Sequence, residues 1–324
     1  MTSVPGRMWA AGRQRIAGGN ASDRAFRWGT LLCALVVVLI IVALAVELVR
    51  GAWPALVHFR VPFLASSTWD PVRDVYGALP YVYGAVVSSA LALLVAVPIG
   101  LGSAVFLAEL APAWLRNPVS FLVELLAAVP SVVYGLWGLF VLVPALRPVE
   151  AWLGAHFGFI PLFSGAPYGI GLLAAGLVLA IMILPIITAV SREVLLAVPS
   201  SQRDAAYALG ATHWEALRGP VLRYARAGII GAVILALGRA LGETMAVTMV
   251  IGNSPVISAS LFSPAYTMSS LLANEFAEAT GALHVAALIE IALLLLVITV
   301  IMNAIARLLL WRVAARGAAM GVQG

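Results

Sequence analysis

The sequence predicts an all-α integral membrane protein with six transmembrane helices. Of its 324 residues, 63% are apolar and only 10% are charged, whereas soluble domains carry roughly 25% charged residues. The mean hydropathy of +1.04 leaves too little polar surface to cover a soluble protein of this size, so lipid is the expected solvent for most of the chain. These observations exclude an ordinary soluble enzyme.

Six segments are long and apolar enough to cross a bilayer, because a spanning helix needs about 20 apolar residues and must satisfy its own backbone hydrogen bonds. They are residues 28–46, 77–108, 125–146, 169–190, 227–252 and 282–306. A cleaved signal peptide is the alternative for the first segment, but its apolar run exceeds the roughly 7–15 residues of a signal core. A retained helix over 28–50 is therefore expected, after a mobile tail at 1–27. The single cysteine, Cys33, excludes an internal disulfide.

The distribution of arginine predicts the orientation. The 19 basic residues are all arginine, and they concentrate before the first span, after the fourth span and at the C-terminal end. Because arginine-rich loops stay on the cytoplasmic side, both termini are expected in the cytoplasm of a bacterial plasma membrane protein. The same bias explains the net charge of +5 without a nucleic-acid partner.

The connection after the fourth span has the pattern of two short helices. Pro199 ends the preceding helix, and Ser201 with Asp204 fits a capping box for the first short helix. Ala205 and Ala206 belong to this helix, and Gly210 is the residue type that ends a helix in the left-handed conformation.

The second short helix has its own start and stop signals. Thr212 and Glu215 fit a capping box, and Gly219–Pro220 is expected to end the helix. Two short helices joined by a glycine predict a rigid elbow on the membrane surface, suited to receiving force from a cytoplasmic partner. A surface connector without a partner is the alternative.

Two charges lie inside the fifth predicted span. Arg239 and Glu243 are four residues apart, so a continuous helix would place them one above the other, where they could form an ion pair. Each charge costs about 2.5–3.5 kcal/mol at the bilayer centre, which favours a position inside the bundle. A guanidinium matches a tetrahedral oxyanion, and the carboxylate would keep that anion from binding too tightly. A purely structural ion pair is the alternative.

Two hydroxyl residues accompany these charges as weaker candidates for the substrate pathway. Thr244 lies on a neighbouring helix face, although threonine in membrane helices commonly bonds to its own backbone. Ser131 follows Pro130, where a broken helix would expose backbone to a pathway, and a simple kink is the alternative.

Three stretches of the chain resemble a known family. Asp204-Ala205-Ala206, followed by Gly210 and Gly219-Pro220, resembles the EAA loop of ABC importer permeases, with Asp in place of the usual Glu. The stretches ELLAAVPSVVYGLWG (124–138) and GRALGETMAV (238–247) resemble the PstC family of phosphate permeases. The resemblance covers about residues 25–312 and is far more specific than hydropathy.

This resemblance implies a type I ABC importer (MetI-like) permease fold and ATP-driven import of inorganic phosphate by alternating access. It implies a permease domain at 77–310, a coupling loop at 200–222 and a cytoplasmic tail at 311–324. Two sets of residues are then assigned roles. The substrate pathway would contain Arg239, Glu243, Thr244 and Ser131, and the loop that docks the ATPase would contain Asp204, Ala205, Ala206, Gly210, Glu215 and Gly219.

The implied partners are a PstA-like permease subunit, a PstB-like ATPase dimer and a PstS-like phosphate-binding protein. The chain itself is not expected to hydrolyse ATP, because a sequence without lysine cannot contain the GxxxxGK[ST] phosphate loop. In the family, the intramembrane Arg and Glu that match Arg239 and Glu243 are linked to phosphate passage, and the chain would form half of the pathway.

Several alternatives stay open at this point. Physical chemistry alone does not separate phosphate from sulfate, molybdate or phosphonate, and an ion-coupled secondary carrier is a further possibility. A membrane-embedded protease would need a Ser and a His facing each other, whereas the only His in a span is His284, at a helix start. His284 and Glu290 are six residues apart, which does not fit metal ligands on one helix face, so no metal or cofactor is expected.

Overall fold

The computed structural model describes residues 21–321, and every regular element within this range is a helix. This confirms the predicted all-α class. The chain divides into two units between Gly51 and Ala52. The expected terminal tails fall partly outside the described residues, which exclude 1–20 and 322–324.

The first unit consists of the N-terminal part of helix α1 (Ala21–Phe59). Residues 21–27, expected to belong to a tail, form the first turns of this helix. The helix continues past position 50 into the second unit, so it is longer at both ends than the predicted span. The first proline within this helix is Pro54, so no proline forces the helix to break earlier.

Six helical stretches of the described residues are long and apolar enough to cross a membrane. They are Asp23–Phe59, Leu79–Leu110, Ser131–Phe157, Leu172–Leu196, His213–Leu241 and Ala282–Ile305. The predicted number of membrane helices is confirmed, and the chain is a multi-pass membrane protein.

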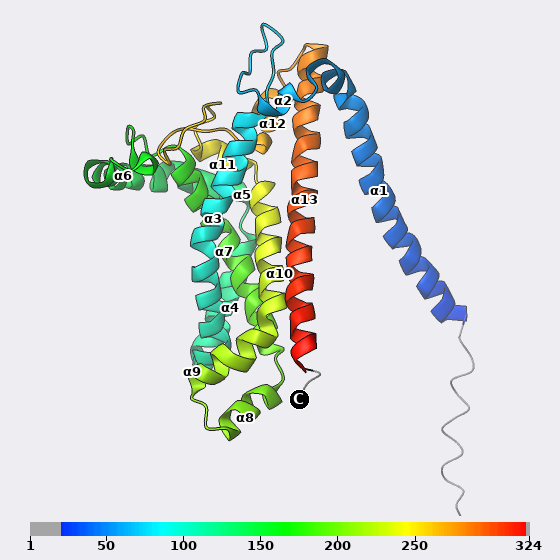
Figure 1. Cartoon of the computed structure of the whole chain (residues 1–324), viewed down its shortest axis with the longest axis vertical. Helices are drawn as coiled ribbons and strands as arrows, with labels where there is room; N and C mark the ends of the chain where they lie inside the picture. The colour runs from blue at the N-terminus through cyan, green and yellow to red at the C-terminus, as the bar shows by residue number, and fades with distance from the viewer. Residues whose placement is uncertain (1–20, 322–324) are drawn as a thin grey trace, which may run out of the picture. The chain divides into compact units, whose positions relative to one another are not determined.

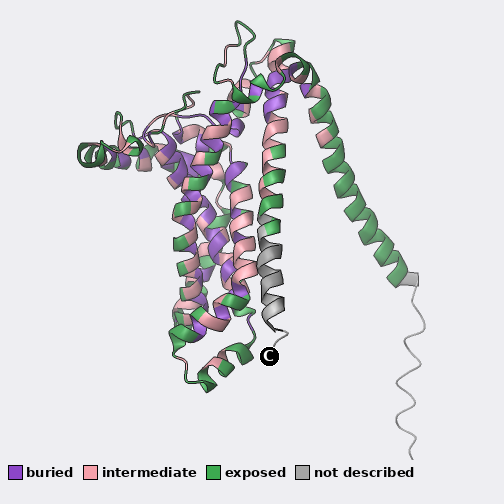
Figure 2. Cartoon of the chain, in the orientation of Figure 1, coloured by how far each residue is buried: buried purple, intermediate pink, exposed green. Residues whose placement is uncertain are grey.

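The core of the second unit is built around α7 (Leu172–Leu196). Figure 1 shows α3 (Leu79–Val105) and α10 (Leu222–Leu241) running beside it, with α13 (Ala282–Gly321) alongside. Figure 2 shows that the buried residues follow α7 and the helix faces turned toward it. Small residues permit this close approach: a Cβ placed on Gly176 of α7 would come within 2.5 Å of Leu91 of α3.

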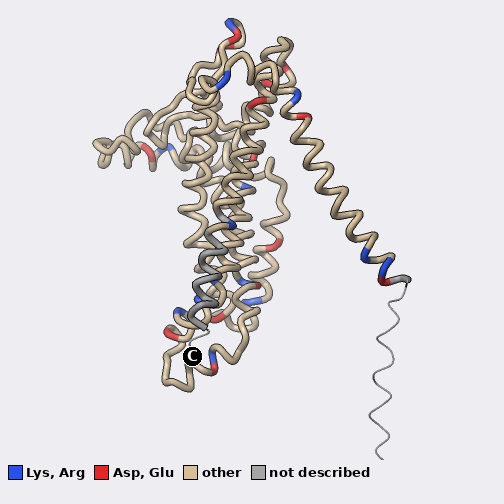
Figure 3. Tube along the Cα trace, turned by 45° about the vertical axis from the view of Figure 1, so that its right-hand side comes forward, with Lys and Arg blue, Asp and Glu red and all other residues tan. Residues whose placement is uncertain are grey.

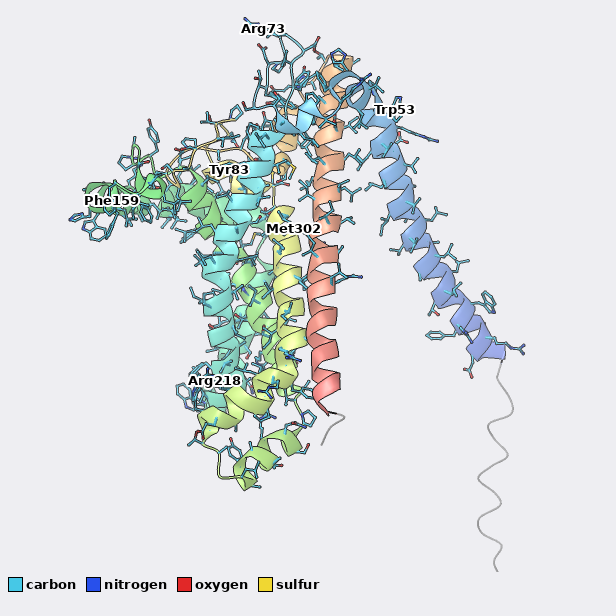
Figure 4. All side chains as sticks on the ribbon, in the orientation of Figure 1. Trp53, Arg73, Tyr83, Phe159, Arg218 and Met302 are labelled. Carbon is cyan, nitrogen blue, oxygen red and sulfur yellow. The ribbon has the colours of Figure 1, made fainter. Side chains whose placement is uncertain are left out.

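The third predicted span, residues 125–146, contains a helix break. The chain forms α4 (Ala113–Ala128), α5 (Ser131–Trp137), the π-turn η2 (Gly138–Leu142) and α6 (Val143–Phe157). The break falls at Val129, whose extended backbone (ψ 130°) is what a following proline imposes. Helix α6 then runs sideways from the bundle (Figure 1), with Phe159 labelled beyond its end in Figure 4.

The remaining short elements lie at the two ends of this bundle. At one end are α8 (Ser200–Ala208), α9 (His213–Ala216) and the π-turn η4 (Leu217–Val221), together called the elbow below; the π-turn η1 (Phe106–Leu110) ends the neighbouring helix. At the opposite end are α2 (Pro62–Ala65), the 3₁₀ turn η3 (Pro161–Phe163), α11 (Met245–Val250) and α12 (Met268–Glu275). Figure 3 shows charged residues gathered mostly toward these two ends, and Figure 4 labels Arg218 at the first end and Arg73 at the other.

The end opposite the elbow is held by aromatic side chains and is called the aromatic end below. The Trp69 indole N–H donates to a Glu275 carboxylate oxygen at 2.8 Å, and His284 contacts the same oxygen at 3.2 Å. The ring of Tyr76 stacks on His284 with a centroid distance of 5.4 Å. Burial and the nearby Asp74 carboxylate raise the pKa of Tyr76 to about 12. The contact of His284 with Glu275 is one that the sequence reasoning did not predict.

Candidate functional site

The elbow begins differently from the prediction. Helix α8 starts at Ser200, with Pro199 as the preceding residue, and no side chain caps its first turn. The predicted capping box of Ser201 and Asp204 is therefore wrong. Because the helix starts before Ser201, both side chains already lie within helical turns and cannot reach the free N–H groups as an N-cap would.

Gly210 and the second capping box occur as the sequence predicts. Gly210 has a φ of +83°, in the left-handed region, so it ends α8 as predicted. Thr212 and Glu215 form a reciprocal capping box: the Thr212 N–H donates to a Glu215 carboxylate oxygen at 2.8 Å, and the Glu215 N–H donates to the Thr212 hydroxyl at 3.4 Å. This part of the predicted elbow is confirmed.

The predicted end of the second short helix at Gly219–Pro220 is wrong. Helix α9 passes through η4 directly into α10, so this second part of the elbow and the fifth span are one continuous helical segment. Proline lacks a backbone N–H, and the π-turn accommodates it because the helix continues through hydrogen bonds made by other residues. The Leu222 N–H donates to the carbonyl oxygen of Leu217, five residues earlier.

The elbow exposes apolar side chains at its tip. Leu209 is 89% exposed and Trp214 is 63% exposed, and Tyr207 is exposed beside them. Asp204 and Ala205 are also exposed, whereas Ala206 is half-buried. An apolar patch at the water-facing end of a membrane bundle is typical of a surface that a protein partner covers.

The sequence reasoning missed the contact that fixes α8. Arg203 of α8 forms an ion pair with Glu109 of η1, with a second guanidinium nitrogen 3.4 Å from the other carboxylate oxygen. The same guanidinium donates to the carbonyl oxygens of Val198 at 2.8 Å and Leu195 at 3.1 Å. A signal was present, because Glu109 is the only acidic residue between positions 77 and 123. The sequence did not indicate which arginine would meet it.

The charges of the fifth span occupy the wall of an open hollow. The hollow has a volume of about 590 Å³ and combines one residue from α7, several from α10 and one from α13. The lining residues are Ile186, Ile234, Leu235, Gly238, Arg239, Gly242, Glu243 and Asn303. Arg239 is exposed toward it and Glu243 is buried.

The expected stacking of Arg239 above Glu243 on one helix is wrong. Helix α10 ends at Leu241, and a separate helix, α11, begins at Met245. Glu243 lies in the break between them, where its Oε1 accepts the Ala246 N–H at 3.3 Å. Within the described residues no ion pair joins it to Arg239. Glycine at 242 favours such a break because it lowers helix propensity and readily ends a helix.

The two candidate hydroxyls do not line this hollow. Thr244 turns its hydroxyl to the Gly242 carbonyl at 3.4 Å. Ser131 begins α5 after the break at Pro130. Asn303 of α13 was missed by the sequence reasoning, although an amide in a predicted span is a visible signal. Its Nδ2 donates to the Thr299 carbonyl at 2.9 Å, which orients the side chain on its helix.

The two long sequence motifs meet in space. Helix α5, from the first motif, packs on α11, from the second. A Cβ placed on Gly135 would lie 3.0 Å from the Ala246 Cα and 2.6 Å from the Met249 sulfur, so only glycine permits this distance. Helix α5 thus packs against the helix that follows the break at Glu243 and fixes its position. Among the described residues, no group of three His, Cys, Asp or Glu side chains is arranged to hold a metal ion.

Comparison with known proteins identifies the family. Residues 96–314 match the family of binding-protein-dependent transport system inner membrane components. Over 300 residues the chain is 50% identical to a phosphate transport system permease protein PstC of Mesorhizobium japonicum, covering 91% of this chain and 92% of that protein. The chain belongs to the PstC family. As a PstC-family permease, it is one membrane subunit of a multi-subunit ABC importer.

Solved structures confirm the fold of this PstC-family chain. A methionine ABC transporter, MetNI, in an inward-facing conformation matches with a TM-score of 0.51 and 20% identity, covering 71% of this chain and 91% of that one. A bacterial ABC transporter that imports alginate matches with a TM-score of 0.55 and 16% identity, covering 89% and 99%. The predicted MetI-like permease fold is therefore confirmed.

Proposed function

We propose that this chain forms half of the translocation pathway of an ATP-driven importer of inorganic phosphate. The observation that carries the proposal is the hollow in which Arg239 faces an open side of the bundle, in a chain 50% identical to a phosphate transport permease. ATP hydrolysis is assigned to a separate PstB-like ATPase dimer. The other proposed partners are a PstA-like permease, which completes the pathway, and a PstS-like phosphate-binding protein.

Arg239 is the proposed phosphate contact. Its planar guanidinium offers five N–H donors in a geometry that matches two oxygens of a tetrahedral anion. Since no carboxylate of the described residues pairs with it, these donors are available to a substrate. The buried Glu243 carboxylate on the same wall repels an anion, which keeps binding weak enough for release. Thr244 and Ser131 stay candidates for a supporting role in the pathway.

The elbow is the proposed docking site of the ATPase. Asp204, Ala205 and Gly210 lie in or beside its exposed face, with Ala206 half-buried behind them. The Glu215 capping box stiffens the second turn, and Gly219 lies in the π-turn that joins the elbow to α10. ATP binding closes the ATPase dimer and moves the elbow, and α10 carries that movement to Arg239. The closed state is favoured by the difference in ATP affinity between the two conformations.

The orientation follows from charge. The elbow and the arginine-rich termini are placed in the cytoplasm, and the aromatic end faces the opposite side, where a binding protein delivers phosphate. The proposed location is therefore a bacterial plasma membrane, with both termini in the cytoplasm.

Replacing Arg239 tests the proposal. Arg239→Gln should abolish phosphate uptake by intact cells, whereas the variant still co-purifies with its ATPase. Arg223→Gln, at an exposed position of α10 outside the elbow, is the matched control for loss of an arginine. Normal phosphate uptake by Arg239→Gln would overturn the proposed contact, and uptake of sulfate rather than phosphate by the wild type would overturn the substrate.

A further inference from the structure

The helix break at Glu243 is held by a side chain from a separate helix. The Ser269 hydroxyl, in the first turn of α12, donates to the Glu243 carbonyl oxygen at 2.7 Å. Ser269 is 5% exposed and Glu243 is 8% exposed, so this hydrogen bond is buried. In a continuous helix the same carbonyl would accept the N–H of residue 247, but α11 begins only at Met245. The Ser269 hydroxyl therefore supplies the donor that a buried carbonyl at a helix break needs.

Ser269 is itself fixed by the start of α12. Thr267 and Ser270 form a reciprocal capping box: the Thr267 N–H donates to the Ser270 hydroxyl at 3.0 Å, and the Ser270 N–H donates to the Thr267 hydroxyl at 3.2 Å. The hydroxyl oxygens of Thr267 and Ser269 lie 3.3 Å apart. Directly before this turn, the Tyr266 carbonyl leaves no room for a Cβ at Gly84 of α3. The Ser269 hydroxyl thus has a fixed position relative to α3.

The opposite end of α12 is also tied to its surroundings. Figure 1 shows this helix at the aromatic end, beside α13. Its last residue, Glu275, accepts the Trp69 indole N–H and contacts His284 of α13. Leu271, in the middle of the helix, is fully buried. Eight helical residues extend about 12 Å, so α12 is a short rigid connection between the aromatic end and the break at Glu243.

We propose that Ser269 is a positioning residue of the phosphate pathway, an inference that rests on the proposed function. Its hydrogen bond holds the break so that the Glu243 carboxylate keeps its place in the lining of the hollow, where it weakens anion binding at Arg239. Ser269 does not line this hollow, so it acts through Glu243 and not by contact with phosphate. Without the hydroxyl, a buried carbonyl loses its partner, which favours a shift of the backbone at the break.

Hydrogen exchange tests the contact without requiring transport. The Ala246 N–H donates to the Glu243 Oε1 at 3.3 Å, so exchange of this amide reports whether Glu243 keeps its place. In the purified transporter complex, Ser269→Ala should accelerate this exchange about fivefold, as expected for the loss of one hydrogen bond of ordinary strength. Ser263→Ala, which removes a hydrogen bond between two hydroxyls in the loop before α12, is the matched control and should exchange like the wild type. Equal exchange in Ser269→Ala and the wild type overturns the proposal.

Uptake kinetics test the function of the contact. Glu243→Gln removes the repulsion of the anion and should lower the KM for phosphate uptake about tenfold, together with the maximal rate, because release is slower. Ser269→Ala should lower KM in the same direction by about threefold or more, since a carboxylate that is no longer held in place opposes the anion less. The double variant should match Glu243→Gln, because Ser269 acts only through that carboxylate. A purely structural role of Ser269 would lower the maximal rate alone.

The outcomes distinguish a failure of the positioning role from a failure of the proposed function. An unchanged KM in Glu243→Gln would overturn the role of Glu243 in the pathway, and the positioning role of Ser269 with it. A lower KM in Glu243→Gln but not in Ser269→Ala would overturn the positioning role alone. A further fall of KM in the double variant would do the same, because Ser269 would then have an effect independent of Glu243.

Discussion

Arg203 in the first elbow helix forms an ion pair with Glu109 at the end of the helix that begins at Leu79. The same guanidinium binds the carbonyl oxygens of Leu195 and Val198, near the end of α7. One side chain therefore fastens α8 to two different membrane helices. Because a cation at a helix C-terminus also interacts favourably with the helix dipole, this contact makes the elbow a rigid extension of the bundle.

Breaking this contact should uncouple the elbow from the bundle. In Arg203→Gln, the partly buried Glu109 loses its charged partner, and we expect a stability loss of about 1.5–3 kcal/mol, typical of hydrogen bonds to charged groups. ATP hydrolysis should continue while phosphate uptake per ATP falls. Thermal denaturation and the ratio of uptake to hydrolysis measure the two effects. Glu193→Gln, which alters an ion pair with a 69% exposed carboxylate, should change neither.

Gly210 should be needed for its backbone conformation and not for space. A Cβ at this position would meet nothing within 4 Å, but its φ of +83° strains any other residue by about 1–2 kcal/mol. Gly210→Ala should therefore reorient the turn between α8 and α9 and lower coupled uptake. Gly231→Ala in α10, outside the elbow, is the control, since its Cβ also meets nothing and its φ is ordinary. Equal uptake by the two variants would show that the left-handed turn is dispensable.

Amino-acid composition was enough to predict the membrane-spanning segments. The positions at which helices break were harder to predict. Six apolar segments were enough to give the membrane spans. The motif GRALGETMAV favoured one continuous helix by periodicity, yet it breaks at Gly242, because capping of α11 by Glu243 and packing of α5 behind it compensate for the lost turn. The packing contribution comes from α5, more than 100 positions away, and has no local sequence signal.

The same reasoning applies to the site residues. Arg239 stood out because a charge in an apolar span is costly, whereas Asn303 did not, since an amide there costs less and often bonds to its own helix. Both side chains line the same hollow, from α10 and from α13. Conversely, Gly219–Pro220 was a misleading signal: these residues usually end a helix, but the π-turn η4 accommodates them.

A negative charge introduced at position 303 should weaken phosphate binding. Asn303→Asp adds a second carboxylate to the lining of the hollow that contains Glu243, and repulsion of the anion should raise the KM for uptake about tenfold or more. Asn303→Leu removes the amide without adding charge and should have a smaller effect. Asn117→Asp adds the same charge at an exposed position and should leave KM unchanged. A KM in Asn303→Asp equal to that of the wild type would exclude Asn303 from the pathway.

Tyr76 should make the aromatic end sensitive to alkaline pH. Its pKa is raised from 10.0 to about 12 in the folded chain, so the folded state favours the neutral phenol. The resulting stabilisation is complete below pH 10 and is lost as the pH rises from about 10 to about 12. Tyr76→Phe should flatten the decline of thermal stability in this window. Tyr168→Phe, at a position 58% exposed, should retain the decline.

Gly135 of α5, which packs against α11, should not tolerate a larger side chain. A methyl group there would lie 2.6 Å from the Met249 sulfur and 3.0 Å from the Ala246 Cα. The sulfur can move, but the backbone of α11 cannot do so without displacing Glu243, so Gly135→Ala should cost about 1–3 kcal/mol as an overpacking change. Uptake should fall together with thermal stability. Gly102→Ala, whose Cβ would meet nothing within 4 Å, is the control, and Met249→Ala combined with Gly135→Ala should restore only part of the loss because the Ala246 contact remains.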